Sequence, residues 1–205
     1  MDTPKADRIS RQEQAQQTRQ RLFDAAYSLL QEKDFKDITI NEIVSRAGVA
    51  PGTFYLYYES KLDVYYQTYV LSDAYFLEVV APLVKEGSTR ERLLRYFSSY
   101  AYYNAVHSNI KLTRLLYNGE NRNFLRQCAG MYTILHDIVS YGLAAGELDR
   151  ALTADAHCSL LMDLARGLVY RWCISDAAFP LTAAMHEAID RLYLAIRAPS
   201  DGSAG

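Results

Sequence analysis

Short polar motifs that start helices recur along this chain, and each precedes apolar residues at helical spacing. Thr39-x-x-Glu42, Ser60-x-x-Asp63 and Ser88-x-x-Glu91 follow the pattern in which two side chains satisfy backbone N–H groups at a helix start. Strand-like alternation of apolar and polar residues is nowhere sustained. Only five prolines and ten glycines interrupt the 205 residues. The sequence therefore predicts an all-α fold of about nine helices.

The expected helices cover most of the chain. The first is expected at about residues 16–33, the second from Thr39 to Gly48, and a short third at 52–58. The others are expected at about residues 61–85, from Ser88 past Asn104, and at 109–117, 121–145, 153–175 and 181–197. Residues 1–15 are expected to form a flexible arm, and residues 199–205 a disordered tail.

Composition limits the compartment and the partners. Twenty-two Lys and Arg against 24 Asp and Glu leave no global basic field, so any contact with nucleic acid must come from a local patch. Three cysteines without a CxxC spacing indicate a reducing cytosol rather than a disulfide framework. There is no apolar leader in residues 1–20 and no apolar run of about 18 residues. A cytoplasmic protein with no membrane partner is expected.

One motif looks like part of a metal site. His186-Glu187-x-x-Asp190 resembles the zinc motif HExxH, but an Asp replaces its second His, and the other histidines are 21 or more residues apart. The chain also lacks a glycine-rich phosphate loop and a nucleophile elbow. No catalytic residue, metal or cofactor is therefore expected.

Residues 39–58 have the layout of a helix-turn-helix, with a capped helix, a turn that contains Gly48 and a second short helix. Small residues at the start of the second helix would let it approach DNA closely. Spacing alone leaves a second interpretation open, in which the hairpin is structural and the chain is a helical small-molecule-binding protein or enzyme. The candidate groove contacts are Thr53 and Tyr57, and the candidate phosphate contacts are Thr39, Tyr55 and Lys61.

Segment 16–76 resembles the N-terminal domain of the TetR family of bacterial transcriptional repressors. The resemblance is carried by Thr18-Arg19-x-x-Leu22, Ala25-Ala26-x-x-Leu29, Ala47-Gly48-Val49 and Gly52-Thr53-Phe54-Tyr55-x-Tyr57-Tyr58-x-Ser60-Lys61. It implies a three-helix DNA-binding domain over 16–76 and a larger ligand-binding and dimerisation domain over 77–198. The expected protein is a homodimer that binds a pseudo-palindromic double-stranded operator and is released by a small effector. Activation instead of repression stays open.

The same resemblance assigns roles to individual residues. It places base contacts at Pro51, Gly52, Thr53 and Tyr57, and phosphate contacts at Thr39, Tyr55 and Lys61. Asn41 occupies a position where some members place a base-reading arginine. Arg46 and Lys61 flank the reading helix. Residues 1–62 hold nine Lys and Arg and nine Asp and Glu, so only a modest basic face is expected.

The remaining predictions concern the larger domain. Seventeen tyrosines, against seven phenylalanines and one tryptophan, suit a cavity, because the ring is apolar and its hydroxyl is polar. The expected lining residues are Tyr66, Tyr69, Tyr100, Tyr103, Asn104, Tyr132, His136 and Trp172. Without a cluster of Arg or Lys among them, a neutral or weakly charged, partly apolar effector is expected. The expected dimer contacts are Leu160, Leu164, Leu168, Ile189, Leu192 and Ile196, with intramolecular core as the alternative.

Overall fold

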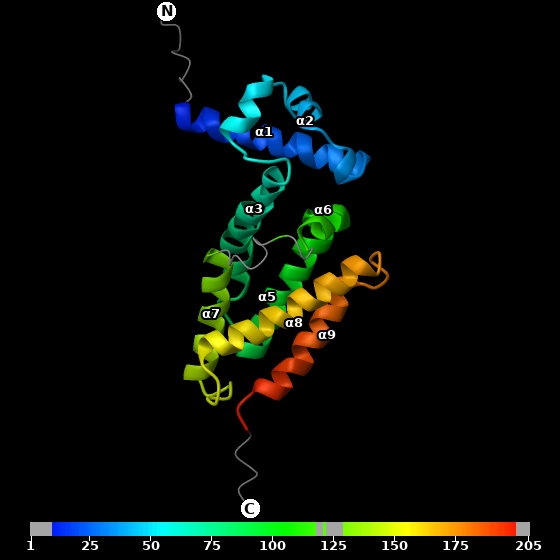
Figure 1. Ribbon diagram of the computed structural model, residues 1–205. Helices are drawn as coiled ribbons and strands as arrows, with labels where there is room; N and C mark the ends of the chain where they lie inside the picture. The colour runs from blue at the N-terminus through cyan, green and yellow to red at the C-terminus, as the bar shows by residue number, and fades with distance from the viewer. Residues whose placement is uncertain (1–9, 118–120, 122–128, 200–205) are drawn as a thin grey trace, which may run out of the picture. The chain divides into compact units, whose positions relative to one another are not determined.

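The computed structural model describes residues 10–117, 121 and 129–199 (Figure 1). The chain divides into two compact units, Met1–Gln67 and Thr68–Gly205. This division falls inside the segment expected for the first domain. Residues 1–9 of the expected arm, residues 122–128 of the helix expected at 121–145, and residues 200–205 of the tail lie outside the described residues.

In its described residues, from Ser10 onward, the first unit has two α-helices and three 3₁₀ segments. Helix α1 (Arg11–Glu32) begins earlier than expected, because Ser10 and Glu13 form a capping box that apolar spacing does not reveal. Segment η1 (Phe35–Asp37) and helix α2 (Ile40–Ala47) follow. Gly48 ends α2 in the left-handed conformation, as predicted, with φ of 64°. The short third helix is the 3₁₀ segment η2 (Pro51–Leu56), and η3 (Asp63–Tyr66) precedes the second unit.

The core of the first unit packs against the apolar face of α1. The buried residues from α1, α2 and the later segments include Leu22, Ala26, Leu29, Ile43, Val44, Phe54 and Val64. Two buried tyrosines also attach to the backbone of α1. The Tyr58 hydroxyl donates to the carbonyl of Arg19 at 3.1 Å, and the Tyr65 hydroxyl donates to that of Ala26 at 2.9 Å. These two bonds attach the segments that follow η2 to helix α1.

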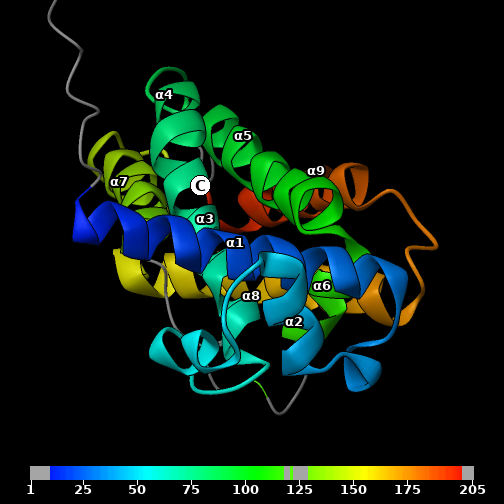
Figure 2. The same cartoon turned by 90° about the horizontal axis from the view of Figure 1, so that it is seen from above.

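The second unit is a bundle of longer helices. Its elements are α3 (Gln67–Tyr75), η4 (Phe76–Val80), α4 (Ala81–Leu83), α5 (Thr89–Tyr102), η5 (Tyr103–His107), α6 (Asn109–Leu116), α7 (Ala129–Ala144), α8 (Ala154–Ile174) and α9 (Leu181–Ile196). Helix α5 packs against α7 and α9, and α8 packs against α6, α7 and α9 (Figure 2). Their shared core includes Phe97, Leu135, Val139, Leu161, Val169 and Ile189.

Two π-helical turns widen this bundle. In η4, the Ala81 N–H bonds the carbonyl of Phe76, five residues earlier. The following Pro82 has no N–H for a regular helical bond, so the helix expected over 61–85 does not run without interruption. In η5, the Ser108 N–H bonds the Tyr103 carbonyl at 2.9 Å. Each π turn contributes side chains to the cavity described below.

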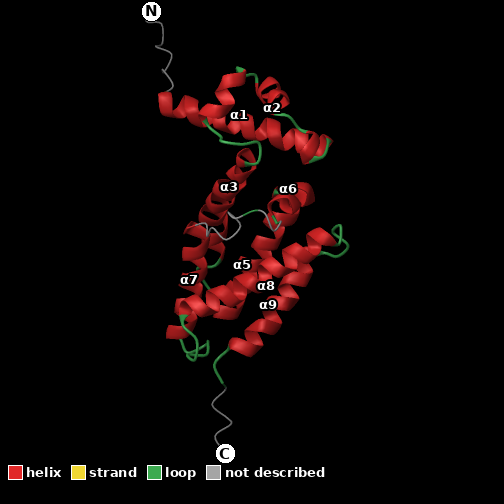
Figure 3. Cartoon of the chain, viewed as in Figure 1, coloured by secondary structure: helices red, strands yellow, loops and turns green. Residues whose placement is uncertain are grey.

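The described residues contain helices and no strand (Figure 3). Their one β-type pairing is an isolated antiparallel bridge between Leu148 and Arg197. Across the described ranges no helix is both long enough and apolar enough to cross a membrane. Within the same ranges, no three His, Cys, Asp or Glu side chains form a group that could hold a metal ion.

The contact between α5 and α7 predicts a stability effect at Gly142. A Cβ atom at this position would lie 2.7 Å from the side chain of buried Thr89 and 2.9 Å from Leu148 Cδ1. We therefore expect Gly142→Ala to lower the free energy of unfolding by about 1–3 kcal/mol through overpacking. Asp137→Ala, at an exposed position of α7, is the control and should change it by less than about 0.5 kcal/mol. Urea unfolding measures both, and equal stability of the two variants would contradict this packing.

Candidate nucleic-acid interface and ligand cavity

The recognition segment η2 presents an exposed face made of small and hydroxyl-bearing residues. Pro51 and Gly52 are exposed, Tyr55 is 64% exposed, and Thr53 is half-buried. Phe54 is fully buried and anchors the segment to the core of the first unit. The polar side and the anchoring side of this short segment are therefore clearly separated.

The neighbouring residues follow the same division. Tyr57 is half-buried, whereas Tyr58 is 5% exposed and packs in the core. Leu56 is 78% exposed, which leaves an apolar side chain beside the hydroxyl groups. An exposed leucine suits contact with a thymine methyl group in a major groove.

The fold itself does not require glycine at position 52. No atom of the chain lies within 4 Å of a Cβ built there, and its φ is not positive. The absence of a side chain leaves backbone accessible from outside the unit. Close approach by another molecule gives a physical reason for glycine at this position.

The start of α2 is held by its predicted capping box. The Glu42 N–H donates to the Thr39 hydroxyl at 3.2 Å, and the Thr39 N–H and hydroxyl both donate to Glu42 Oε2, at 2.9 and 2.8 Å. The Thr39 side chain is therefore already engaged at the position where it was predicted to contact phosphate. Asn41, two residues later, is exposed.

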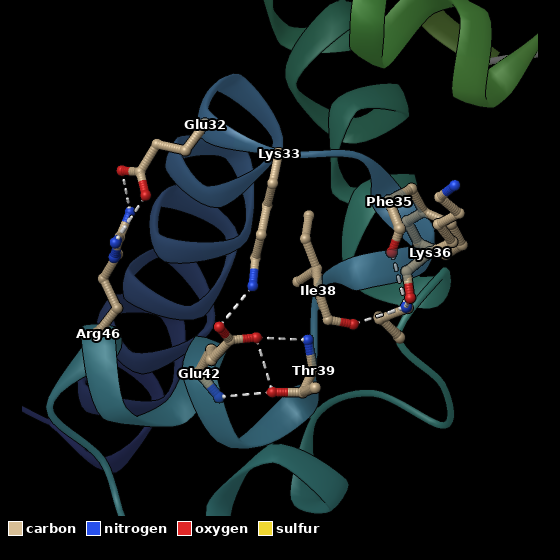
Figure 4. Close-up of polar contacts among 9 residues, drawn as sticks. Glu32, Lys33, Phe35, Lys36, Ile38, Thr39, Glu42 and Arg46 are labelled. Carbon is tan, nitrogen blue, oxygen red and sulfur yellow. Dashed lines mark hydrogen bonds and ion pairs between the residues drawn. The ribbon is translucent and has the colours of Figure 1, made fainter.

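Two basic side chains near α2, Lys33 and Arg46, pair with acids of the same unit (Figure 4). Lys33 binds Glu42, and this hydrogen bond lowers the pKa of Glu42 to about 2, with the capping contacts of Thr39 acting in the same direction. Arg46 binds both carboxylate oxygens of Glu32, and its contact lowers the pKa of that carboxyl group. Arg46 is thus directed to α1 rather than standing unpaired beside η2.

Lys61 is also engaged inside the first unit. Its ammonium donates to the carbonyl oxygens of Ile38 at 2.6 Å, Phe35 at 2.7 Å and Lys36 at 3.5 Å, and it lies 4.3 Å from the centre of the Phe35 ring. Burial lowers its pKa. Three contacts match the three N–H donors of an ammonium group. Lys61 therefore joins the residues after η2 to the turn before α2, and its predicted phosphate contact stays a prediction.

A cavity opens within the second unit, between segments of α3, α5, α6, α7 and α8. It has about 790 Å³ of unfilled space, part of which is open to solvent. Its described lining residues are Thr68, Tyr69, Ser72, Phe76, Tyr96, Tyr100, Tyr103, Asn104, Ser108, Thr113, Leu116, Tyr117, Met131, Tyr132, Leu135, Met162 and Arg166. The mixture of aromatic rings and hydroxyl groups with few charges among the described lining residues is typical of a site for a small organic ligand.

The structure brings together five of the eight residues predicted to line a pocket, which are Tyr69, Tyr100, Tyr103, Asn104 and Tyr132. The other three predictions are wrong for this cavity. Tyr66 belongs to the first unit, Trp172 packs in the core of the second, and His136 lies half-exposed beside Asp155. Helical spacing identified the buried tyrosine stripes but does not distinguish a cavity wall from solid core.

Sequence reasoning also missed lining residues. Tyr96 lies one turn before Tyr100 on α5, and Arg166 lies one turn after Met162 on α8, so both share a face with other lining residues. Tyr117 follows α6 and forms a hydrogen bond with Tyr100 through their hydroxyl groups. That contact joins residues 17 positions apart, and only the tertiary structure shows it.

The predicted dimer residues fall into two sets. Leu160 is 40% exposed on α8, whereas Leu164 is half-buried against the core of its own chain. Leu168, Ile189 and Ile196 are buried in the core of their own chain, so intramolecular packing explains these three. Leu192 is half-buried against the same core. The outward face of α8 also carries Tyr170 and Ile174, which are 50% and 65% exposed.

This arrangement defines a helix-turn-helix protein with a separate ligand cavity. The family profile for bacterial regulatory proteins of the tetR family matches residues 22–66, which include α2 and η2. Residues 22–66 therefore match the TetR family, and the relatives described next are named as regulators.

Known relatives extend the match over both units. The fatty acid metabolism regulator protein of Bacillus subtilis (strain 168) is 25% identical over 181 residues, which cover 85% of this chain and 93% of that protein. The crystal structure of the transcriptional regulator FadR from Bacillus subtilis in complex with stearoyl-CoA shares the fold, with a TM-score of 0.71 and 23% identity over 86% of this chain and 98% of that one. FadR from Bacillus halodurans follows with a TM-score of 0.67, 21% identity, and coverage of 86% and 94%.

The contacts of Lys61 allow an experiment that distinguishes a structural role within the first unit from a contact with a DNA phosphate. Lys61→Met removes the donors that hold three carbonyl oxygens, so we expect the free energy of unfolding to fall by about 1–3 kcal/mol. We expect the slope of log affinity against log salt concentration on bound DNA to stay unchanged, because the ammonium is used within the unit. A slope smaller by about 0.9 would instead show a phosphate contact. Lys36→Met removes the same charge at an exposed neighbour and should leave stability unchanged.

Proposed function

We propose that this regulator is a repressor that binds a pseudo-palindromic operator as a homodimer and releases it when a partly apolar small molecule occupies the cavity. The observation that carries the proposal is the exposed face of η2, where glycine, threonine and tyrosine stand outward from a buried phenylalanine anchor. The second observation is a cavity in a different unit, which gives a site for a signal apart from the DNA.

The DNA surface is proposed from the residues that the sequence indicated, except Arg46 and Lys61, which bind other groups of the first unit. The residues proposed to face the bases are Pro51, Gly52, Thr53 and Tyr57. Thr39 and Tyr55 are proposed to lie beside the phosphates, and Asn41 at the edge of the base-contacting set. Internal ion pairs use much of the positive charge near α2. Neutral hydroxyl groups therefore supply much of the proposed contact, and a shallow salt dependence is expected.

Dimerisation is proposed through the outward face of α8. Three apolar residues of α8 lie close to one side of the helix. They are Leu160, Leu164 and Ile174, which are four and ten residues apart. Leu160, Tyr170 and Ile174 are exposed, and with half-buried Leu164 they form a stripe that is more apolar than a solvated helix face needs. A two-fold axis through this stripe would supply the two recognition segments that a pseudo-palindrome requires.

The effector class is proposed from the relatives together with the cavity. One relative is named for fatty acid metabolism and another was solved with stearoyl-CoA, which makes acyl compounds the first class to test. The cavity lining supports an apolar body, through Phe76, Leu116, Leu135 and Met162, alongside a few polar groups.

Operator recognition is tested by selecting bound DNA from a random pool with the full chain and measuring affinity by fluorescence anisotropy. We expect a two-fold symmetric sequence, and we expect stearoyl-CoA, but not free CoA, to lower the affinity.

Thr53→Ala should reduce discrimination between the selected and a scrambled sequence by about tenfold, because it removes a proposed base contact. Thr133→Ala, exposed on α7, is the control. A pool that yields no preferred sequence would contradict operator binding.

The dimer surface is tested by a charge placed in the stripe. Ile174→Asp should convert the dimer to a monomer in sedimentation velocity and weaken operator binding about a hundredfold, because linked half-sites lose their effective concentration. Val79→Asp adds the same charge at a position of η4 that is 45% exposed and should leave the dimer intact. A dimer that survives Ile174→Asp would contradict this interface.

A further inference from the structure

Three basic side chains near α2 and η2 are already bound within the first unit. Lys33 and Arg46 each pair with a glutamate (Figure 4), and the Lys61 ammonium donates to three backbone carbonyls. A phosphate that bound one of these cations would have to break or share its existing contacts. These three side chains are therefore poor sources of a phosphate contact.

Arg19 of α1 differs from these three residues. Its side chain is exposed, and among the described residues it takes part in no ion pair. Two nearby carboxylates act electrostatically on the neighbouring Tyr58, but both have other partners. Asp24 accepts from a side-chain amide at 2.8 Å, and Asp63 accepts from a backbone N–H at 3.0 Å. Within the described chain, the charge of Arg19 is therefore left without a direct counter-ion.

Contacts with Tyr58 place Arg19 beside the recognition segment. The Arg19 guanidinium carbon lies 5.9 Å from the centre of the Tyr58 ring, and the Tyr58 hydroxyl donates to the Arg19 carbonyl at 3.1 Å. Tyr58 comes two residues after η2, and its N–H donates to the carbonyl of Phe54 in that segment at 3.0 Å. One tyrosine thus joins α1 to η2, and an exposed cation stands at the junction.

The Tyr58 ring is a rigid support for the guanidinium. It is 5% exposed, and its centre lies 5.6 Å from that of Phe54, the buried anchor of η2. Burial raises the pKa of Tyr58, and the Arg19 guanidinium acts in the opposite direction, so its charge reaches the ring. A guanidinium held over a ring keeps its N–H donors in one plane and loses less conformational freedom when it binds. This fork of donors fits two oxygens of a phosphate.

Other exposed cations of the first unit are placed differently. Arg21 lies two residues after Arg19, which turns it by about 200° around α1. Its guanidinium donates to a threonine hydroxyl of the same helix at 3.2 Å and lines a groove between α1 and α2. Arg11 and Lys36 are exposed, and in the described part of the chain no side-chain hydrogen bond, ion pair or ring contact joins them to η2. Arg19 is therefore the cation that the contacts of this unit hold beside η2.

We propose that Arg19 binds a phosphate of the DNA backbone next to the bases that η2 contacts, and that the Tyr58 ring positions its guanidinium for this contact. This rests on the proposed function, because it takes the exposed face of η2 to be the DNA surface. It gives α1 a phosphate contact of the kind that the sequence predicts for Lys61. Phosphates carry no sequence information, so Arg19 raises the affinity for all duplexes by the same factor.

The test measures binding of the full chain to two DNA duplexes by fluorescence anisotropy, at salt concentrations from about 50 to 200 mM. One duplex has a mixed sequence, and the other carries the sequence selected from the random pool. Arg19→Met should reduce the slope of log affinity against log salt concentration by about 0.9 for each bound protomer. At physiological salt it should lower the affinity for both duplexes about tenfold, as loss of a charged hydrogen bond does.

Two further variants control for total charge and for stability. Arg21→Met removes the same charge from the same helix and should leave the slope unchanged. Arg19→Lys keeps the charge but not the planar fork, so it should keep the slope and bind both duplexes less tightly than the unaltered chain. An unchanged slope for Arg19→Met, a loss confined to the selected sequence, or an equal fall in slope for Arg19→Lys would each overturn the proposal.

The outcomes also separate this inference from the proposed function. A preferred sequence in the pool, together with an unchanged slope for Arg19→Met, would overturn the phosphate contact and leave operator recognition in place. A pool without a preferred sequence, together with the smaller slope on the mixed-sequence duplex, would do the reverse.

Discussion

The ammonium of Lys61 holds the turn that precedes α2, and the geometry of the helix-turn-helix depends on this contact. Its hydrogen bonds to the carbonyls of Phe35 and Ile38 link chain on either side of the α2–η2 hairpin. The hydroxyl groups of Tyr58 and Tyr65 bind the backbone of α1 from the same later segment. The short 3₁₀ recognition segment between these attachments contributes little order of its own, so its exposed residues are positioned by the contacts around it.

This construction has an electrostatic consequence. Lys33 and Arg46 pair with Glu42 and Glu32 at the surface of the unit, so neighbouring acids offset part of the positive charge near α2. In the proposed complex, hydroxyl and backbone groups on η2 and the joining of two copies would supply much of the affinity for DNA. A balanced total charge is thus compatible with a DNA-binding domain, because shape and hydrogen bonding replace part of the long-range attraction.

In the second unit, the π turns and the cavity belong to one arrangement. The wider turn of η5 contains Tyr103 and Asn104, and the hydroxyl of Thr113 bonds the Asn104 carbonyl at 2.8 Å. The π turn of η4 contains Phe76, which also lines the cavity. In a regular α-helix, the residues that follow each turn would point to a different side of the helix. The two π turns therefore decide which side chains line the cavity.

Sequence by itself determined the helices, the capping boxes at Thr39 and Ser88, the left-handed Gly48 and the helix-turn-helix, because each depends on residues within one or two turns of chain. It also indicated the tyrosine-rich wall, of which Tyr69, Tyr100 and Tyr132 are members. Only the tertiary structure decided that Lys61 binds three carbonyls, that Arg46 turns to Glu32, that Trp172 is core, and that Arg166 and Tyr117 reach the cavity. Amphipathic spacing shows that a helix face is buried, but whether it meets another helix, a partner or a cavity depends on contacts between residues far apart in the chain.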